Sequence, residues 1–188
     1  MLTIRAGQRH FGENYIQELA TKAASMPLDI NWHFIGTLQS NKCKVIAQIP
    51  NLFLVETVAS VKTAIALDKA CAAAGRSEPL GILLQINTSN EDSKGGLRDS
   101  DCVSAAREVM QSCQHLKLRG LMTIGSPENS AISPNPDFAA LVHCKSEVER
   151  ACGISGLELS MGMSHDYENA IMQGSTNVRV GSRIFGAR

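Results

Sequence analysis

The chain has 188 residues, of which 44% are hydrophobic and 19% charged, a composition typical of a globular protein with one sizeable core. Lysine plus arginine and aspartate plus glutamate balance at 18 each, so no global field attracts nucleic acid or an anionic membrane surface. The opening "MLTIRAGQRH" is too short an apolar run for a signal peptide, and no stretch approaches the ~20 apolar residues of a membrane span. We therefore expect a cytosolic or organellar matrix protein without nucleic-acid or membrane partners.

Seven strand-like segments follow one another along the chain, separated by helical patterns. They cover residues 9–15, 31–36, 51–57, 79–87, 116–125, 156–163 and 176–182. No hairpin dipeptide joins two of them, so the alternation predicts a parallel sheet and a single domain over residues 1–188. The longest loop, residues 125–137, carries three of the six prolines and is expected to connect a strand to its helix.

Six cysteines are spread along the chain without a CxxC pair. Most of them fall in helix-like segments that lack the spacing of metal ligands. We therefore expect reduced, structural thiols instead of disulfides or a zinc site.

Two α/β folds compete for this alternation. A doubly wound sheet normally carries a glycine-rich phosphate loop after its first strand, and neither GxGxxG nor GxxxxGK[ST] occurs here. A (β/α)₈ barrel holds its ligand at the carboxyl ends of the strands, often with phosphate at the last two. The last two predicted strands end in "GMS" and "VGS". This favours the barrel, although a barrel needs eight strands and the sequence shows seven.

Strand parity predicts which side chains face the barrel interior. In "GLELSMGMS" leucines and methionines alternate with a polar or small set, and Arg179 lies between two valines. Because the helix-facing side of a barrel is apolar, the polar set and Arg179 are expected to point inward. The same parity turns inward Asn14, His33, Gln85 and Asn87. Buried polar groups need partners, so this pattern indicates a polar ligand or a dense internal network.

The glycines and serines at the last two strand ends suggest an anion site. Gly162 and Gly181 would let backbone N–H groups approach an anion, and Ser164 is expected to open a helix whose N-terminus favours negative charge. Ser182 completes the second "GS" pair.

Structural interpretations of the same residues remain open. Ser164 could serve only as a helix N-cap, and Arg179 could pair with Glu158 on the neighbouring strand. His33 could be a hydrogen-bonded core residue, and Asn14 could cap the helix that follows it.

Six motifs distributed from about residue 5 to the C-terminus carry a resemblance to a known family. They are "AGQRHFGENYIQEL", "WHFIGTLQSNK", "QINTSNEDSKGGL", "LRGLMTIG", "LSMGMSHDYENAI" and "GSTNVRVGSRIFG". The chain resembles the pyridoxal phosphate homeostasis proteins in their eukaryotic form, which are alanine-racemase-like single-domain barrels. The resemblance implies a cytoplasmic or mitochondrial protein that binds pyridoxal 5′-phosphate (PLP), buffers it or delivers it to PLP-dependent apo-enzymes, and is not itself an enzyme.

The resemblance also assigns roles to the strand-end residues. The family's phosphate contacts match Ser164 and Ser182, with backbone at Met163 and Gly181, and its partner for the ring nitrogen matches Arg179. A permanently charged guanidinium disfavours protonation of the pyridine nitrogen and so weakens the electron sink that amino-acid chemistry needs. Asn14 and His33 match motifs at the cofactor's flank.

Departures from the family lead to further expectations. The family's Schiff-base lysine lies on the first barrel strand, and this chain begins in the helix that should follow it. We therefore expect a (β/α)₈-type barrel without strand 1 and most of helix 1, incomplete at the N-terminus, that binds PLP weakly or non-covalently. By position, Lys42, Lys44 and Lys94 are expected to be solvated surface charges. Arg183 stands where the family commonly has a small residue, and its role is left open.

Two other functions stay under consideration. A truncated fragment that binds no cofactor could act only through protein contacts at exposed strand edges. A PLP-dependent racemase would need the absent lysine and a second proton carrier, such as an opposed tyrosine. The chain has only Tyr15 and Tyr167.

Overall fold

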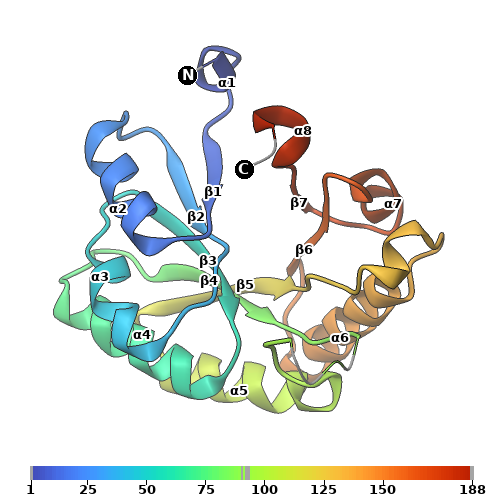
Figure 1. Ribbon diagram of the computed structural model, residues 1–188. Helices are drawn as coiled ribbons and strands as arrows, with labels where there is room; N and C mark the ends of the chain where they lie inside the picture. The colour runs from blue at the N-terminus through green and yellow to red at the C-terminus, as the bar shows by residue number, and fades with distance from the viewer. Residues whose placement is uncertain (1, 90, 92–93, 187–188) are drawn as a thin grey trace.

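All seven expected strands are present in the computed structural model, which describes residues 2–89, 91 and 94–186. They form one parallel sheet in which each strand pairs with its neighbour in chain order (Figure 1). The strands are His10–Glu13 (β1), Asn31–Phe34 (β2), Leu52–Val58 (β3), Leu80–Gln85 (β4), Leu116–Met122 (β5), Glu158–Met163 (β6) and Asn177–Arg179 (β7). Most are shorter than predicted, usually because the last residues of the predicted range belong to the loop that follows.

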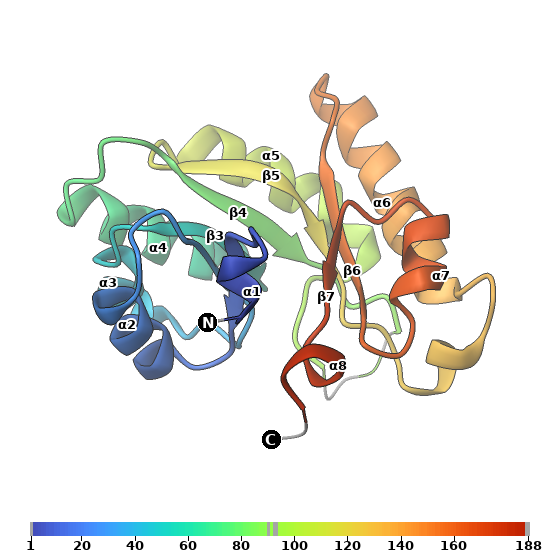
Figure 2. The same ribbon diagram turned by 90° about the horizontal axis from the view of Figure 1, so that it is seen from above.

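The sheet curls into a barrel that stays open between β1 and β7, which do not pair in the described part of the chain. The view from above shows helices on the outside of the curled sheet (Figure 2). Strictly sequential parallel order with outer helices is the barrel arrangement, whereas a doubly wound sheet reverses its strand order at a switch point. The prediction of seven strands with a gap between "FGENY" and "TNVRVGS" is confirmed.

Eight helices accompany the strands in the described residues. They are Leu2–Arg5 (α1), Ile16–Ser25 (α2), Cys43–Ala47 (α3), Val61–Ala73 (α4), Cys102–Ser112 (α5), Pro136–Cys152 (α6), Tyr167–Met172 (α7) and Ser182–Phe185 (α8). Short 3₁₀ turns lie at Ser40–Lys42, Asp99–Asp101 and Glu128–Ala131. None of the helices in the described ranges combines the length and apolarity needed to cross a bilayer.

The main core lies between the sheet and its outer helices. Helix α5 buries Cys102, Ala105, Ala106 and Val109, the face that its 3.6-residue pattern predicts. Its neighbour α6 begins at the N-cap Asn135, whose side chain accepts the Asp137 amide, and ends at Gly153 in the left-handed conformation. Burial of such faces contributes about 25 cal/mol per Å², which is the main term that holds the helices to the sheet.

All six cysteines lie within the described residues, and none forms a disulfide. Five are buried in the core between helices and sheet. Burial raises the pKa of the Cys71 and Cys113 thiols to about 11, which keeps them protonated and unreactive at neutral pH. These buried positions are those of structural side chains, as the sequence predicts for most of the cysteines.

Gly162 is a packing requirement of the fold. Its φ is +93°, and a Cβ atom placed there would lie 2.5 Å from the Cβ of Ala170 in α7. Helix α7 can therefore approach β6 only over a residue without a side chain. Gly174 provides a comparison, because its φ is +94° but an added Cβ would meet nothing within 4 Å.

We expect Gly162→Ala to be more destabilising than Gly174→Ala. Both substitutions impose the same left-handed strain, so their difference isolates the overpacking of α7, which typically costs about 1–3 kcal/mol. Urea unfolding followed by circular dichroism measures both free energies. Equal losses in the two variants would contradict this assignment.

Candidate functional site

The carboxyl ends of β6 and β7 meet at one edge of the sheet, as parallel pairing requires. Met163 of β6 is in register with Arg179 of β7. Just beyond them, the hydroxyl oxygen of Ser164 accepts a hydrogen bond from the Gly181 amide, with N and O 3.1 Å apart. The structure thus brings the "GMS" and "VGS" ends together, and Ser182 follows directly as the first residue of the exposed helix α8.

The loop after β6 corrects the expected cap of α7. Asp166, not Ser164, is the residue before this helix, which starts at Tyr167. The Asp166 carboxylate accepts the Met163 amide at 2.6 Å, so this backbone N–H, matched to the phosphate site, already has a protein partner. Ser164 is 6% exposed and uses its oxygen for the β7 end instead of for the helix.

The two glycines expected to cradle an anion differ in role. Gly162 is needed for the packing of α7, as described above. An added Cβ at Gly181 would meet nothing within 4 Å, and the residue is exposed. Only Gly181 therefore borders open space at this end of the sheet.

Arg179 points into the barrel and bonds one group on β6 and one just after β5. Its Nη1 donates to the Ser160 hydroxyl at 2.7 Å, and its Nη2 donates to the Thr123 carbonyl at 2.9 Å. The suggested pairing with Glu158 is wrong, because Glu158 bonds Arg119, whose guanidinium also lies over the Phe53 ring. Burial lowers the pKa of Arg179 from its usual value, opposed by the negative charge of Glu56, and the group remains charged at neutral pH.

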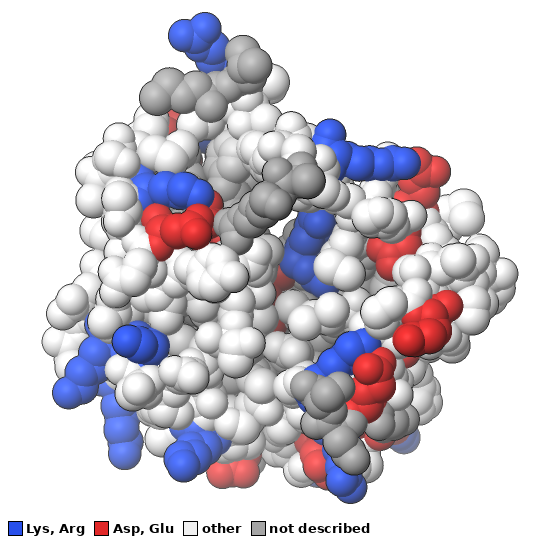
Figure 3. Space-filling view, in the orientation of Figure 1, with Lys and Arg blue, Asp and Glu red and all other residues white. Residues whose placement is uncertain are grey.

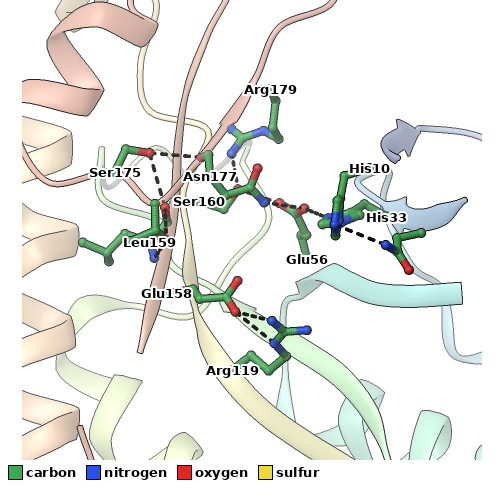
Figure 4. Close-up of polar contacts among 12 residues, drawn as sticks. His10, His33, Glu56, Arg119, Glu158, Leu159, Ser160, Ser175, Asn177 and Arg179 are labelled. Carbon is green, nitrogen blue, oxygen red and sulfur yellow. Dashed lines mark hydrogen bonds and ion pairs between the residues drawn. The ribbon is translucent and has the colours of Figure 1, made fainter. Parts of the chain in front are cut away.

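Glu56, from the middle of β3, is the centre of the lumen network (Figure 4). Its carboxylate is 1% exposed and accepts three hydrogen bonds: from His33 Nδ1 at 2.6 Å, the Ser160 hydroxyl at 2.5 Å and Asn177 Nδ2 at 2.9 Å. Burial alone would raise its pKa, but the bonds from His33 and Ser160 and the charge of Arg179 outweigh burial and hold the pKa below its usual value. Glu56 is therefore ionised at neutral pH.

A chain of imidazoles continues the network towards the open edge at β1. His10 Nδ1 lies 2.8 Å from His33 Nε2, and Asn31 Nδ2 lies 3.2 Å from His10 Nε2. With both imidazoles neutral, Asn31 donates to His10, His10 to His33 and His33 to Glu56, so every bond is satisfied in one direction. Burial, and after it the positive charge of Arg119, lowers the pKa of His10, which agrees with a neutral ring.

The site residues predicted from the sequence do not all lie together in the structure. Ser164, Gly181 and Ser182 lie together at the strand ends, and Arg179 and His33 belong to the lumen network. Met163 is 39% exposed beside them. Asn14 is exposed just after β1 and does not cap α2, whose N-cap is Tyr15. Its side chain joins none of the network bonds described here.

Sequence reasoning missed Glu56, His10 and Asn177. A signal for Glu56 existed, because it is the only charged residue in "NLFLVET", a strand that is otherwise almost wholly apolar. Buried carboxylates in such strands are rarely left unpaired. On the face of the molecule shown in Figure 3, acidic and basic side chains are interspersed, as the balanced net charge indicates.

Comparison with known proteins identifies the family to which this chain belongs. The family model described as "Alanine racemase, N-terminal domain" matches residues 1–188. The pyridoxal phosphate homeostasis protein of Schizosaccharomyces pombe is 49% identical, with 100% of this chain and 78% of the relative covered. The chain belongs to the pyridoxal phosphate homeostasis protein family. The human member is 44% identical, with 97% of this chain and 69% of the relative covered.

Solved structures of relatives have the same fold. PipY of Synechococcus elongatus without PLP has a TM-score of 0.85 at 34% identity, covering 97% of this chain and 84% of PipY. The PLP-bound form of PipY has a TM-score of 0.82 at 32% identity, with the same coverage. A D-threonine aldolase from Filomicrobium marinum, 16% identical with a TM-score of 0.76, covers 97% of this chain and 50% of the aldolase and shares only the fold.

The depressed pKa of Glu56 has a consequence for stability. A carboxylate whose folded-state pKa lies below its unfolded value of about 4.3 stabilises the fold fully above that value and loses this contribution as the pH falls. We expect the free energy of unfolding to fall more steeply between about pH 5 and pH 3 in the native protein than in Glu56→Gln.

Urea unfolding at a series of pH values measures these slopes. The matched control is Glu158→Gln, which removes another lumen carboxylate that bonds Arg119 and not the network. This control should retain the steep acid dependence. An unchanged slope in Glu56→Gln would show that Glu56 is not the group responsible.

Proposed function

We propose that this chain is a binding protein for pyridoxal 5′-phosphate that holds the cofactor without a covalent bond and takes part in intracellular PLP homeostasis. The observation that carries the proposal is the Ser164–Gly181 contact, which places two polar groups at paired strand ends beside an inward arginine. The bound PLP in the PipY structure supports the choice of ligand.

The strand ends provide donors for a phosphate group. Because the Ser164 oxygen accepts the Gly181 amide, its own O–H is directed elsewhere and is available to an anion. The open space at Gly181 and the neighbouring Ser182 hydroxyl lie at the same strand end. The Met163 amide donates to the Asp166 carboxylate, so it can bond a phosphate only after that hydrogen bond is broken.

Arg179 supplies a charge suited to the ring nitrogen. Its Nη1 and Nη2 atoms bond Ser160 and Thr123, while no described residue bonds its Nε. A guanidinium that cannot release a proton favours a neutral, hydrogen-bond-accepting pyridine nitrogen. PLP is the stronger electron sink for amino-acid chemistry when its nitrogen is protonated, so this pairing weakens that sink.

The positions of the lysines support non-covalent binding. All eight are described, and none bonds a residue of the Glu56 network. Lys94 is more enclosed than expected: its side chain is 23% exposed and its Nζ bonds Glu91 and the Gly125 carbonyl. Lys117 shares the lumen-side parity of Arg119 but lies at the amino-terminal end of β5, away from Ser164.

A racemase is the weaker alternative. Of the two tyrosines, Tyr15 is 60% exposed outside the lumen network, and the Tyr167 hydroxyl accepts a bond from Arg183. Arg183 also stacks over the Tyr167 ring, 5.4 Å from its centre, and so ties α8 to α7. The engaged Tyr167 hydroxyl and the exposed position of Tyr15 weigh against an opposed proton carrier.

The proposal also includes the domain organisation, the cellular compartment and the partners of the protein. Residues 1–188 act as one domain in the cytoplasm or mitochondria, and PLP-dependent apo-enzymes receive the cofactor. The rival function is a fragment that binds no cofactor and acts through the unpaired edges of β1 and β7.

We expect the purified protein to bind PLP reversibly, without a single modified lysine. Absorbance titration measures binding, and borohydride reduction followed by peptide mass spectrometry locates any lysine adduct. Binding that survives dialysis only after reduction at one stoichiometric lysine would contradict the non-covalent mode. Absence of saturable binding would favour the fragment interpretation.

We expect Ser164→Ala and Arg179→Met each to weaken PLP binding by about tenfold or more. Each removes a charge-assisted hydrogen bond, worth about 1.5–3 kcal/mol, and tenfold corresponds to about 1.4 kcal/mol. Ser146→Ala on the exposed face of α6 is the control and should bind as the native protein does. Calorimetric dissociation constants equal to the native value in both site variants would exclude this site.

A further inference from the structure

The lumen network links a buried carboxylate on β3 to the arginine on β7. Glu56 and Arg179 do not touch each other, and the Ser160 hydroxyl lies between them, 2.5 Å from the carboxylate and 2.7 Å from Nη1. Figure 4 shows these side chains entering the lumen from opposite sides. Ser160 is 0% exposed, so water does not replace it as the link.

The hydrogen-bond direction along this link is determined by Glu56. An ionised carboxylate can only accept, so the Ser160 hydroxyl must donate to it. The serine oxygen then presents a lone pair to Arg179, whose guanidinium can only donate. With the Thr123 carbonyl as a second acceptor, two nitrogens of the planar guanidinium are held, and its orientation follows.

The charge of Glu56 has a second effect. A buried guanidinium is costly unless a negative charge lies nearby, and Glu56 is the buried carboxylate joined to it through one hydroxyl. The carboxylate of β6, Glu158, is engaged by Arg119. These hydrogen bonds thus form two separate clusters of charged groups, and Arg179 belongs to the one that contains Glu56.

We propose that Glu56 is a positioning residue that holds Arg179, through Ser160, in place to recognise a hydrogen-bond acceptor on the ligand ring. This deepens the proposed function and rests on it, because it concerns the ring nitrogen of a PLP-type ligand. Glu56 acts on specificity: it makes the site prefer a phosphorylated pyridine over a phosphate ester whose ring carries no acceptor.

The test compares two phosphate esters that lack the aldehyde, so that surface lysines do not react. Pyridoxine 5′-phosphate has the pyridine nitrogen, whereas benzyl phosphate has a ring without it. We expect Glu56→Gln and Ser160→Ala to weaken pyridoxine 5′-phosphate binding about tenfold in calorimetry and to leave benzyl phosphate binding unchanged. Glu158→Gln, the matched control, should change neither. Equal effects on both ligands, or no effect on either, overturn the positioning role.

A second measurement needs no ligand. A double-mutant cycle of Glu56→Gln and Arg179→Met in urea unfolding should show coupling of about tenfold in the unfolding equilibrium constant. The corresponding cycle of Glu158→Gln and Arg179→Met should be additive. If the native protein binds neither ester, the proposed function fails and this cycle decides alone: coupling supports the Glu56–Arg179 link, and additivity overturns it.

Discussion

The hydrogen bonds that Glu56 accepts join the two ends of an open sheet across its lumen. In the sheet formed by the described residues, strands β1 to β3 are joined to strands β6 and β7 through β4 and β5. Ser160 and Asn177 reach Glu56 from the second group, and His33 reaches it from the first. An ionised carboxylate of 1% exposure is tolerated only with such partners. The network therefore both stabilises the charge and holds the barrel wall in its curvature.

The same arrangement explains where the candidate site lies. Parallel strands bring their carboxyl ends to one edge of the sheet, and β6 and β7 are neighbours there. Ser164 and Gly181 bond each other at that edge, while Arg179 is held one layer deeper by Ser160 and Thr123. The proposed phosphate donors and the guanidinium proposed to face the ligand ring thus have a common origin in strand register. The family membership and the PLP-bound PipY structure are consistent with a ligand of this kind.

The strand ends also show which structural roles a local sequence pattern does not predict. Gly162 and Gly181 have equivalent places in "GMS" and "VGS", yet one is required by Ala170 of α7 and the other borders open space. Ser164 has the sequence signature of an N-cap, but Asp166 occupies the position before α7. A cap or a close approach depends on where the next element packs, and strand parity carries no information about that.

The sequence by itself determined the seven strands, their parallel alternation with helices and the inward orientation of Arg179 and His33, because these follow from periodicities among residues close in the chain. Its motifs also indicated the family. Only the tertiary structure decided that Arg179 bonds Ser160 and not Glu158, and that Glu56 is the common acceptor. Glu56 lies 104 residues from Ser160 and 121 from Asn177. Which side chains meet across the lumen depends on the curvature and register of the whole sheet, and no local pattern encodes them.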